Sequence, residues 1–153
     1  MFKKLSVLLL LVLLGGHNEF KDLDTYVYEG VSMTPTIQNE QKIQVDKKYY
    51  QDTPVKRGDI VLFEKEGEDF DQHAKRVIGL PNEMLEFKDG TVYIDGEKLS
   101  KKYHFNHVEG EAIQLKKNEY FVIGDNALSS KDSRHFGPLQ EEEILGKVII
   151  EED

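Results

Sequence analysis

Apolar and polar residues alternate in short stretches along most of this chain, which predicts strands joined by turns. Residues 42–46 alternate with a period of two, as in a strand with one buried face. Residues 59–63 form a short, mainly apolar run behind an Arg-Gly pair, which favours a buried strand. Further strands are predicted for residues 25–28, 74–80, 85–87, 91–94, 119–123 and 147–150. Beyond the N-terminal segment, only residues 139–145 suggest a helical turn.

Two Asp-Gly pairs, at residues 89–90 and 95–96, interrupt the middle of the chain. An Asp-Gly pair favours a tight hairpin because both turn residues need a positive φ. We therefore predict a small inserted β subdomain over residues 82–118. Together with the strands predicted on either side, this subdomain indicates an all-β, antiparallel fold. We expect a partly closed, barrel-like core with a β-hairpin insertion.

The N-terminus has a different pattern. A pair of lysines precedes an unbroken apolar run over residues 7–14, and a glycine pair closes it. A membrane-spanning helix needs about 20 apolar residues, so this run is short. We interpret residues 1–16 as a short apolar anchor helix in the cell membrane, with a removed leader as the alternative. Since the lysines stay inside, residues 17–153 should form a domain on the extracytoplasmic side.

Composition and charge exclude several kinds of chemistry. The formal net charge of −9 would repel a polyanion, so no nucleic acid is expected as a partner. The chain has no cysteine, which removes disulfides, thiolate catalysis and Cys-ligated zinc. Among the histidines, His104 and His107 are close in sequence, but no third ligand clusters nearby. We expect no metal and no other cofactor.

A serine lies between a glycine and a proline just past the first predicted strand, in residues 30–36. Gly30 leaves the backbone sterically open, and Pro35 fixes the chain on the far side. The hydroxyl of Ser32 can therefore be presented rigidly, as a nucleophile requires. A simple turn is the alternative interpretation of this segment.

Lys75 lies inside the strand predicted for residues 74–80. A period of two puts Lys75 and Val77 on one face and Arg76 on the other, so one of the two cations should point toward apolar surroundings. More commonly, a lysine in such a strand lies at the rim of the sheet, and its charged end reaches solvent. If Lys75 is buried instead, its pKa falls by up to about 3–5 units, and it becomes a usable base near neutral pH.

Residues 124–137 are dense in turn formers and hydrogen-bonding side chains. Turns closed by Asn and Asp side chains, with an ion pair between Asp132 and Arg134, could simply brace a loop. A loop that folds back this tightly is also where binding and catalytic groups tend to lie.

Together these segments resemble the motif series of a known family. Residues 32–36, 57–61, 75–81 and 124–137 resemble, in order and spacing, the motifs of bacterial type I signal peptidases (leader peptidases), which are serine endopeptidases with a Ser–Lys dyad. The resemblance runs from about residue 28 to residue 147. Two features depart from it: the apolar N-terminal run is short, and the insertion after Pro81 is compact.

The resemblance implies a role for each motif residue. Ser32 would attack the scissile carbonyl, and Lys75 would act as the general base. Ser130 would orient the lysine amine by a hydrogen bond, and Asp132 and Arg134 would brace the site.

The same resemblance implies where the oxyanion of the reaction would be stabilised. The backbone N–H of Ser32 would be one donor. Gly30 occupies the position where some relatives carry a second, hydroxyl donor.

The implied substrates are the signal peptides of exported preproteins, with small residues at positions −1 and −3. The peptide would lie extended between residues 26–30 and 71–74. The implied contacts are Tyr26, Tyr28, Met33, Pro35, Gln72 and Ala74. Membrane lipid is the second implied partner.

Two alternatives stay open at this point. A repressor-type, self-cleaving peptidase also uses a Ser–Lys pair on a β scaffold, but it would be cytosolic. A catalytically silent or specialised paralogue could act as a binding subunit, although such a protein would be expected to lose Ser32 or Lys75.

Overall fold

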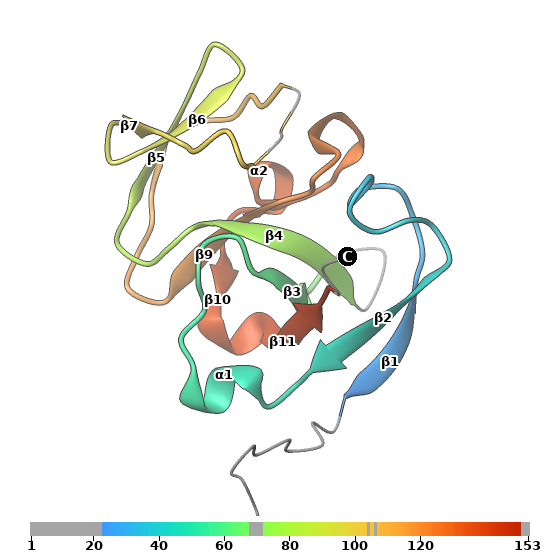
Figure 1. The fold of residues 1–153 in the computed structure, drawn as a ribbon. Helices are drawn as coiled ribbons and strands as arrows, with labels where there is room; N and C mark the ends of the chain where they lie inside the picture. The colour runs from blue at the N-terminus through green and yellow to red at the C-terminus, as the bar shows by residue number, and fades with distance from the viewer. Residues whose placement is uncertain (1–22, 68–71, 104, 106, 151–153) are drawn as a thin grey trace, which may run out of the picture.

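The computed structural model describes residues 23–67, 72–103, 105 and 107–150, and the predicted anchor at residues 1–16 lies outside them (Figure 1). The structure is mostly β, with two antiparallel sheets and few helices. In the part of the chain described, no helix is long and apolar enough to cross a membrane.

The larger sheet has seven strands in the order β1-β2-β11-β3-β4-β9-β10. Their bounds are β1 (Asp24–Tyr28), β2 (Gln41–Asp46), β3 (Ile60–Phe63), β4 (His73–Gly79), β9 (Glu119–Ile123), β10 (Leu139–Gln140) and β11 (Ile144–Ile149). The expected partly closed barrel is wrong, because the sheets do not close: among the described strands, β1 and β10 form the two edges of this sheet. Closure requires the edge strands to pair with each other, and β10 contains only two residues.

The smaller sheet lies between β4 and β9 in sequence, in the order β7-β6-β5-β8. Its strands are β5 (Met84–Lys88), β6 (Thr91–Ile94), β7 (Glu97–Lys98) and β8 (Ile113–Gln114). Asp89 and Gly90 join β5 to β6 with φ of 51° and 69°, and Asp95 and Gly96 join β6 to β7 with φ of 51° and 81°. The hairpin turns predicted from the two Asp-Gly pairs are therefore confirmed.

The helical segments are single turns: α1 (Tyr49–Asp52), η1 (Ala127–Ser129), α2 (Ser133–Phe136) and η2 (Glu141–Glu143). The helical turn expected over residues 139–145 is reduced to η2, because β10 and the start of β11 occupy the rest of that stretch.

β4 lies inside the larger sheet, where β3 and β9 pair with its two edges. Five of its seven residues are buried, which fits a strand covered on both faces. Lys75 is one of them, with only 4% of its surface exposed. The fold thus takes a lysine amine out of water rather than letting it reach the surface.

Burial lowers the pKa of Lys75 from its ordinary 10.5 to about 8, although the negative charge of Asp132 opposes this effect. Because the unfolded chain holds this proton more tightly, the folded state is penalised fully below pH 8. The penalty disappears as the pH rises from about 8 to about 10.5, where both states have lost the proton. At one pKa unit per ~1.4 kcal/mol, it amounts to about 3 kcal/mol at neutral pH.

We therefore expect Lys75→Met to raise the free energy of unfolding at pH 7 by about 3 kcal/mol, because it removes the buried cation at similar side-chain volume. The gain should shrink as the pH approaches 10.5. Urea denaturation at several pH values measures it. Lys42→Met, on the exposed part of β2, is the control and should change little. A Lys75→Met protein less stable than the parent at pH 7 would contradict this account.

Candidate active site

Ser32 lies in the turn that follows β1. Gly30 has a φ of +114°, a conformation that L side chains rarely adopt, so glycine is needed where the chain leaves the strand. Its N–H donates to Asn39 Oδ1 at 2.8 Å, and the Ser32 carbonyl accepts from the backbone N–H of Asn126 at 3.0 Å. The turn holding Ser32 is thus fixed from both sides.

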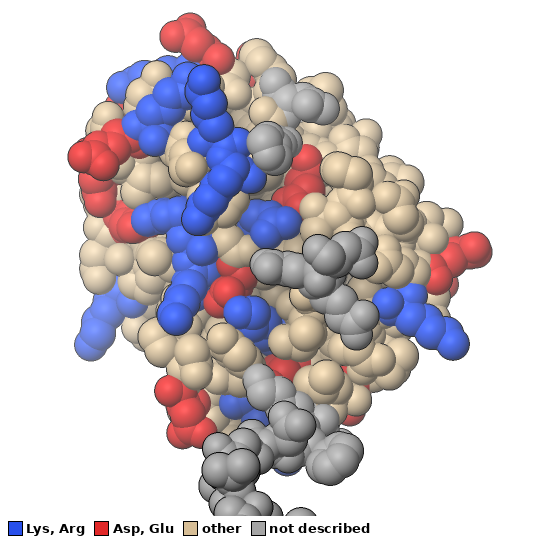
Figure 2. Space-filling view, viewed as in Figure 1, with Lys and Arg blue, Asp and Glu red and all other residues tan. Residues whose placement is uncertain are grey.

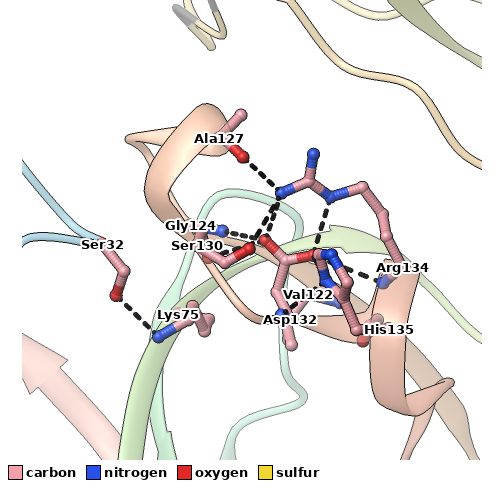
Figure 3. Close-up of polar contacts among 10 residues, drawn as sticks. Ser32, Lys75, Val122, Gly124, Ala127, Ser130, Asp132, Arg134 and His135 are labelled. Atoms are coloured by element: carbon pink, nitrogen blue, oxygen red, sulfur yellow. Dashed lines mark hydrogen bonds and ion pairs between the residues drawn. The ribbon is translucent and has the colours of Figure 1, made fainter.

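Lys75 reaches Ser32 from β4. Its Nζ is 2.8 Å from Ser32 Oγ and 3.1 Å from the carbonyl oxygen of Ala74 (Figure 3). The two residues are 43 positions apart in sequence, so the fold brings them together. A hydroxyl beside an amine whose pKa lies near 8 is the arrangement that general-base activation of a serine requires.

The segment 124–137 folds around one buried carboxylate, Asp132, which has no exposed surface. Asp132 accepts hydrogen bonds from Arg134 Nε at 2.8 Å, from the N–H of Gly124 at 3.0 Å and from Ser130 Oγ at 2.7 Å (Figure 3). The Arg134 guanidinium also donates to the Ala127 carbonyl at 2.7 Å. The Asp132–Arg134 pair expected from the sequence is present, and it ties the loop to β9 through Gly124.

The hydroxyl of Ser130 lies beside the Asp132 carboxylate and is not hydrogen-bonded to the amine of Lys75. Its hydroxyl donates to Asp132, whereas the hydrogen bonds of Lys75 among the described residues go to Ser32 and Ala74. The predicted Lys75–Ser130 hydrogen bond is therefore not formed in this structure.

Gly124 allows the loop to approach the serine closely. A methyl group at this position would collide with Ser130 Oγ and with the Ser32 carbonyl oxygen. Glycine is thus required where the 124–137 segment crosses the turn of Ser32.

A second ion pair, between Arg76 and Asp125, joins the same segments from the other face of β4. Arg76 Nε donates to Asp125 Oδ1 at 2.7 Å, and Thr36 Oγ1 donates to Asp125 as well. This pair was not predicted from the sequence, although the alternation along β4 puts Arg76 on the face opposite Lys75. The acidic Asp125 in the loop after β9 is the other sequence feature that could have indicated this ion pair.

A cleft of about 380 Å³ opens beside Ser32 and Lys75. Of the predicted substrate contacts, Tyr26, Tyr28, Gln72 and Ala74 line it, as does Gly30. The two others lie elsewhere.

Met33 is completely buried in the apolar cluster beneath the turn, so it cannot touch a peptide in the cleft. Pro35 lines a separate hollow with Arg57 and Tyr103. Residue 71, at one end of the predicted peptide site, lies outside the described residues.

One contact of Ser32 was not predicted from the sequence. The hydroxyl of Tyr28, which the sequence analysis placed only among the substrate contacts, lies 2.8 Å from Ser32 Oγ. Nothing in the spacing of the two residues signals this contact, because it depends on how the turn at Gly30 folds back.

No group of His, Asp and Glu side chains suited to a metal ion occurs among the described residues, and His104 is not one of these. The polar groups at the site are the hydroxyls of Ser32 and Tyr28, the amine of Lys75 and the buried ion pair of Asp132 and Arg134.

Comparisons with known proteins agree with this geometry. The family model described as signal peptidase, peptidase S26, matches residues 2–151. Signal peptidase I V of Bacillus subtilis is 38% identical over 80% of this chain and 82% of its own length. Signal peptidase IB of Staphylococcus aureus is 34% identical over 80% of this chain and 74% of its own length.

The fold is also similar to a solved structure. A crystal structure of a signal peptidase I from Enterococcus faecalis aligns with a TM-score of 0.54 at 30% identity, over 63% of this chain and 98% of that one. With a family match that spans nearly the whole sequence, the chain belongs to the signal peptidase family, peptidase S26, and is a serine peptidase.

Proposed function

We propose that this protein removes N-terminal signal peptides from exported preproteins, with Ser32 as nucleophile and Lys75 as general base. The observation that carries the proposal is the 2.8 Å contact between Lys75 Nζ and Ser32 Oγ in a buried setting. A silent paralogue would not need to keep a lysine in this costly position, so an active enzyme is the better account.

The chemistry follows from the two side chains. Neutral Lys75 takes the proton of Ser32 as Oγ attacks the scissile carbonyl, and the resulting ammonium returns that proton to the leaving amine. The backbone N–H of Ser32 is the proposed donor to the oxyanion. Water then attacks the acyl-enzyme, with Lys75 again as base.

The buried ion pair has a supporting role in this proposal. Asp132 lies close enough to raise the pKa of Lys75 against the effect of burial. Together with Arg134 and Ser130 it would keep the lysine in place and stabilise its ammonium form during turnover. Because its proton goes to Asp132, Ser130 would contact the lysine amine by accepting one of its N–H groups on a free lone pair.

The preprotein would bind as an extended strand beside β1, whose outer edge is free among the described strands. Main-chain pairing would provide affinity, and the shallow cleft lined by Tyr26, Gln72 and Ala74 would admit only small side chains at positions −1 and −3.

The remaining expectations form part of the same proposal. Residues 1–16 would be a membrane anchor or a leader, and residues 17–153 the catalytic domain on the extracytoplasmic side, with residues 82–118 as its inserted β subdomain.

Lys and Arg side chains gather on one face over the region of β5 to β7, despite the net charge of −9 (Figure 2). Such a surface suits contact with anionic lipid headgroups.

Ser32→Ala should abolish cleavage of a preprotein by the detergent-solubilised protein while leaving its melting temperature nearly unchanged, because one hydroxyl contributes little stability. Ser130→Ala should slow cleavage, and Ser129→Ala should be far milder, because only Ser130 bonds to the buried carboxylate. Gel assays of mature product measure all three. Cleavage above a trace by Ser32→Ala refutes the nucleophile, and equal effects of the two other variants refute the role of Ser130.

The rate of cleavage should rise with pH through about 8, the pKa of Lys75, and persist into alkaline solution, because only the neutral amine accepts a proton. Lys75→Arg should be as inactive as Lys75→Ala, since a guanidinium does not release its proton at these pH values. Steady-state rates on a quenched fluorescent peptide measure the profile. If one His→Gln substitution silences the enzyme while Lys75→Arg stays active, the dyad is refuted.

The protein should fractionate with membranes, and the surroundings of Tyr103 should be cleaved by protease added outside intact spheroplasts. Immunoblotting of fractions and of protease-treated spheroplasts measures both properties. Protection of that region in intact spheroplasts, with cleavage after lysis, would place the domain in the cytoplasm and contradict the proposed location.

A further inference from the structure

Ser32 Oγ has two polar neighbours rather than one. Lys75 Nζ and the hydroxyl of Tyr28 each lie 2.8 Å from it. Tyr28 is the last residue of β1, and the turn at Gly30 folds the chain back so that Ser32 meets this hydroxyl.

The proton count at Ser32 determines the direction of the Tyr28 contact. A serine hydroxyl has one proton and two acceptor lone pairs. When Lys75 is neutral and about to act as the base, the serine proton must point at Nζ. Tyr28 can then only donate its own proton to Ser32 Oγ, which accepts on a lone pair.

The surroundings of Tyr28 keep its hydroxyl in place. The residue is 8% exposed and belongs to the apolar cluster that includes Ile43, Leu62 and Ala74. Its carbonyl oxygen accepts from the N–H of Glu40 at 2.7 Å, which closes the end of the strand. Burial also raises the pKa of the Tyr28 hydroxyl, so it remains a donor at the alkaline pH where Lys75 is neutral.

We infer that Tyr28 is a further catalytic residue, whose hydroxyl donates a hydrogen bond to Ser32 Oγ, aims it, and stabilises the negative charge that develops there. As the serine proton passes to Lys75 Nζ and the bond from Oγ to the carbonyl carbon forms, Tyr28 keeps its own proton throughout. The inference rests on the proposed function, and it adds a second interaction at the nucleophile to that of the lysine.

Tyr28→Phe tests the inference, because it removes only the hydroxyl and keeps the ring that lines the cleft. The probe is an internally quenched peptide with Ala at positions −1 and −3, cut by the full-length protein in detergent. We expect kcat to fall roughly a hundredfold, at the low end of the loss seen when one donor to a developing charge is removed, with KM unchanged. The preference for Ala over Ser at position −1 should also be unchanged.

Tyr50→Phe is the matched control. Its hydroxyl, also partly buried, donates to Asp59 at 3.1 Å, away from the cleft, so this variant should keep the kcat of the parent. Comparable melting temperatures for the two variants would show that the loss in Tyr28→Phe is not a folding defect.

Several outcomes separate this inference from the function on which it rests. If the parent protein does not cut the peptide or any preprotein, the proposed function fails. If the parent cuts and Tyr28→Phe keeps kcat within twofold, only the role of Tyr28 is refuted. If kcat is kept while KM or the preference at position −1 changes, Tyr28 merely lines the cleft, and the inference is again wrong.

Discussion

The removal of one lysine amine from water is the constraint on which the rest of this structure depends. The proposed role of Lys75 as a base depends on the burial of β4, which pairs with β3 and β9 along its two edges and packs into the apolar clusters of the core. The cost of burying the cation is borne by the packing of the whole domain. This is a common relation in enzymes, where a group needed for reaction is held in an environment that stability alone would not choose.

Two ion pairs hold the 124–137 segment beside Ser32 and Lys75. Asp132 with Arg134 orders the loop after β9, and Arg76 with Asp125 connects that loop to the other face of the strand. Both carboxylates are well shielded, so each pair is held by charged hydrogen bonds rather than by weak surface attraction. Gly124 leaves room for the turn of Ser32, whose carbonyl oxygen a side chain at this position would meet.

The parts of this structure that depend on local sequence could be predicted, and those that depend on tertiary pairing could not. The Asp-Gly turns follow from local backbone preference, and Ser32 and Lys75 stood out through their motifs. Whether the sheet closes depends on how its edges meet, which no local pattern encodes. The burial of Met33 and the contact of Tyr28 with Ser32 both follow from the path of one turn, which alternation along a strand does not describe. The bond of Ser130 to Asp132 depends likewise on how the loop folds.

The outer edge of β1, unpaired among the described strands, has a consequence beyond the proposed binding of a substrate. Its backbone N–H and C=O groups offer a template to any extended chain, including a second copy of the same protein, and Val27 on this strand is 57% exposed. Natural sheets commonly protect such edges with charges, bulges or covering segments, because unprotected edges promote aggregation. If β1 receives the substrate as proposed, this edge has to stay available, so the solubility of the free protein depends on the charged residues that flank the strand.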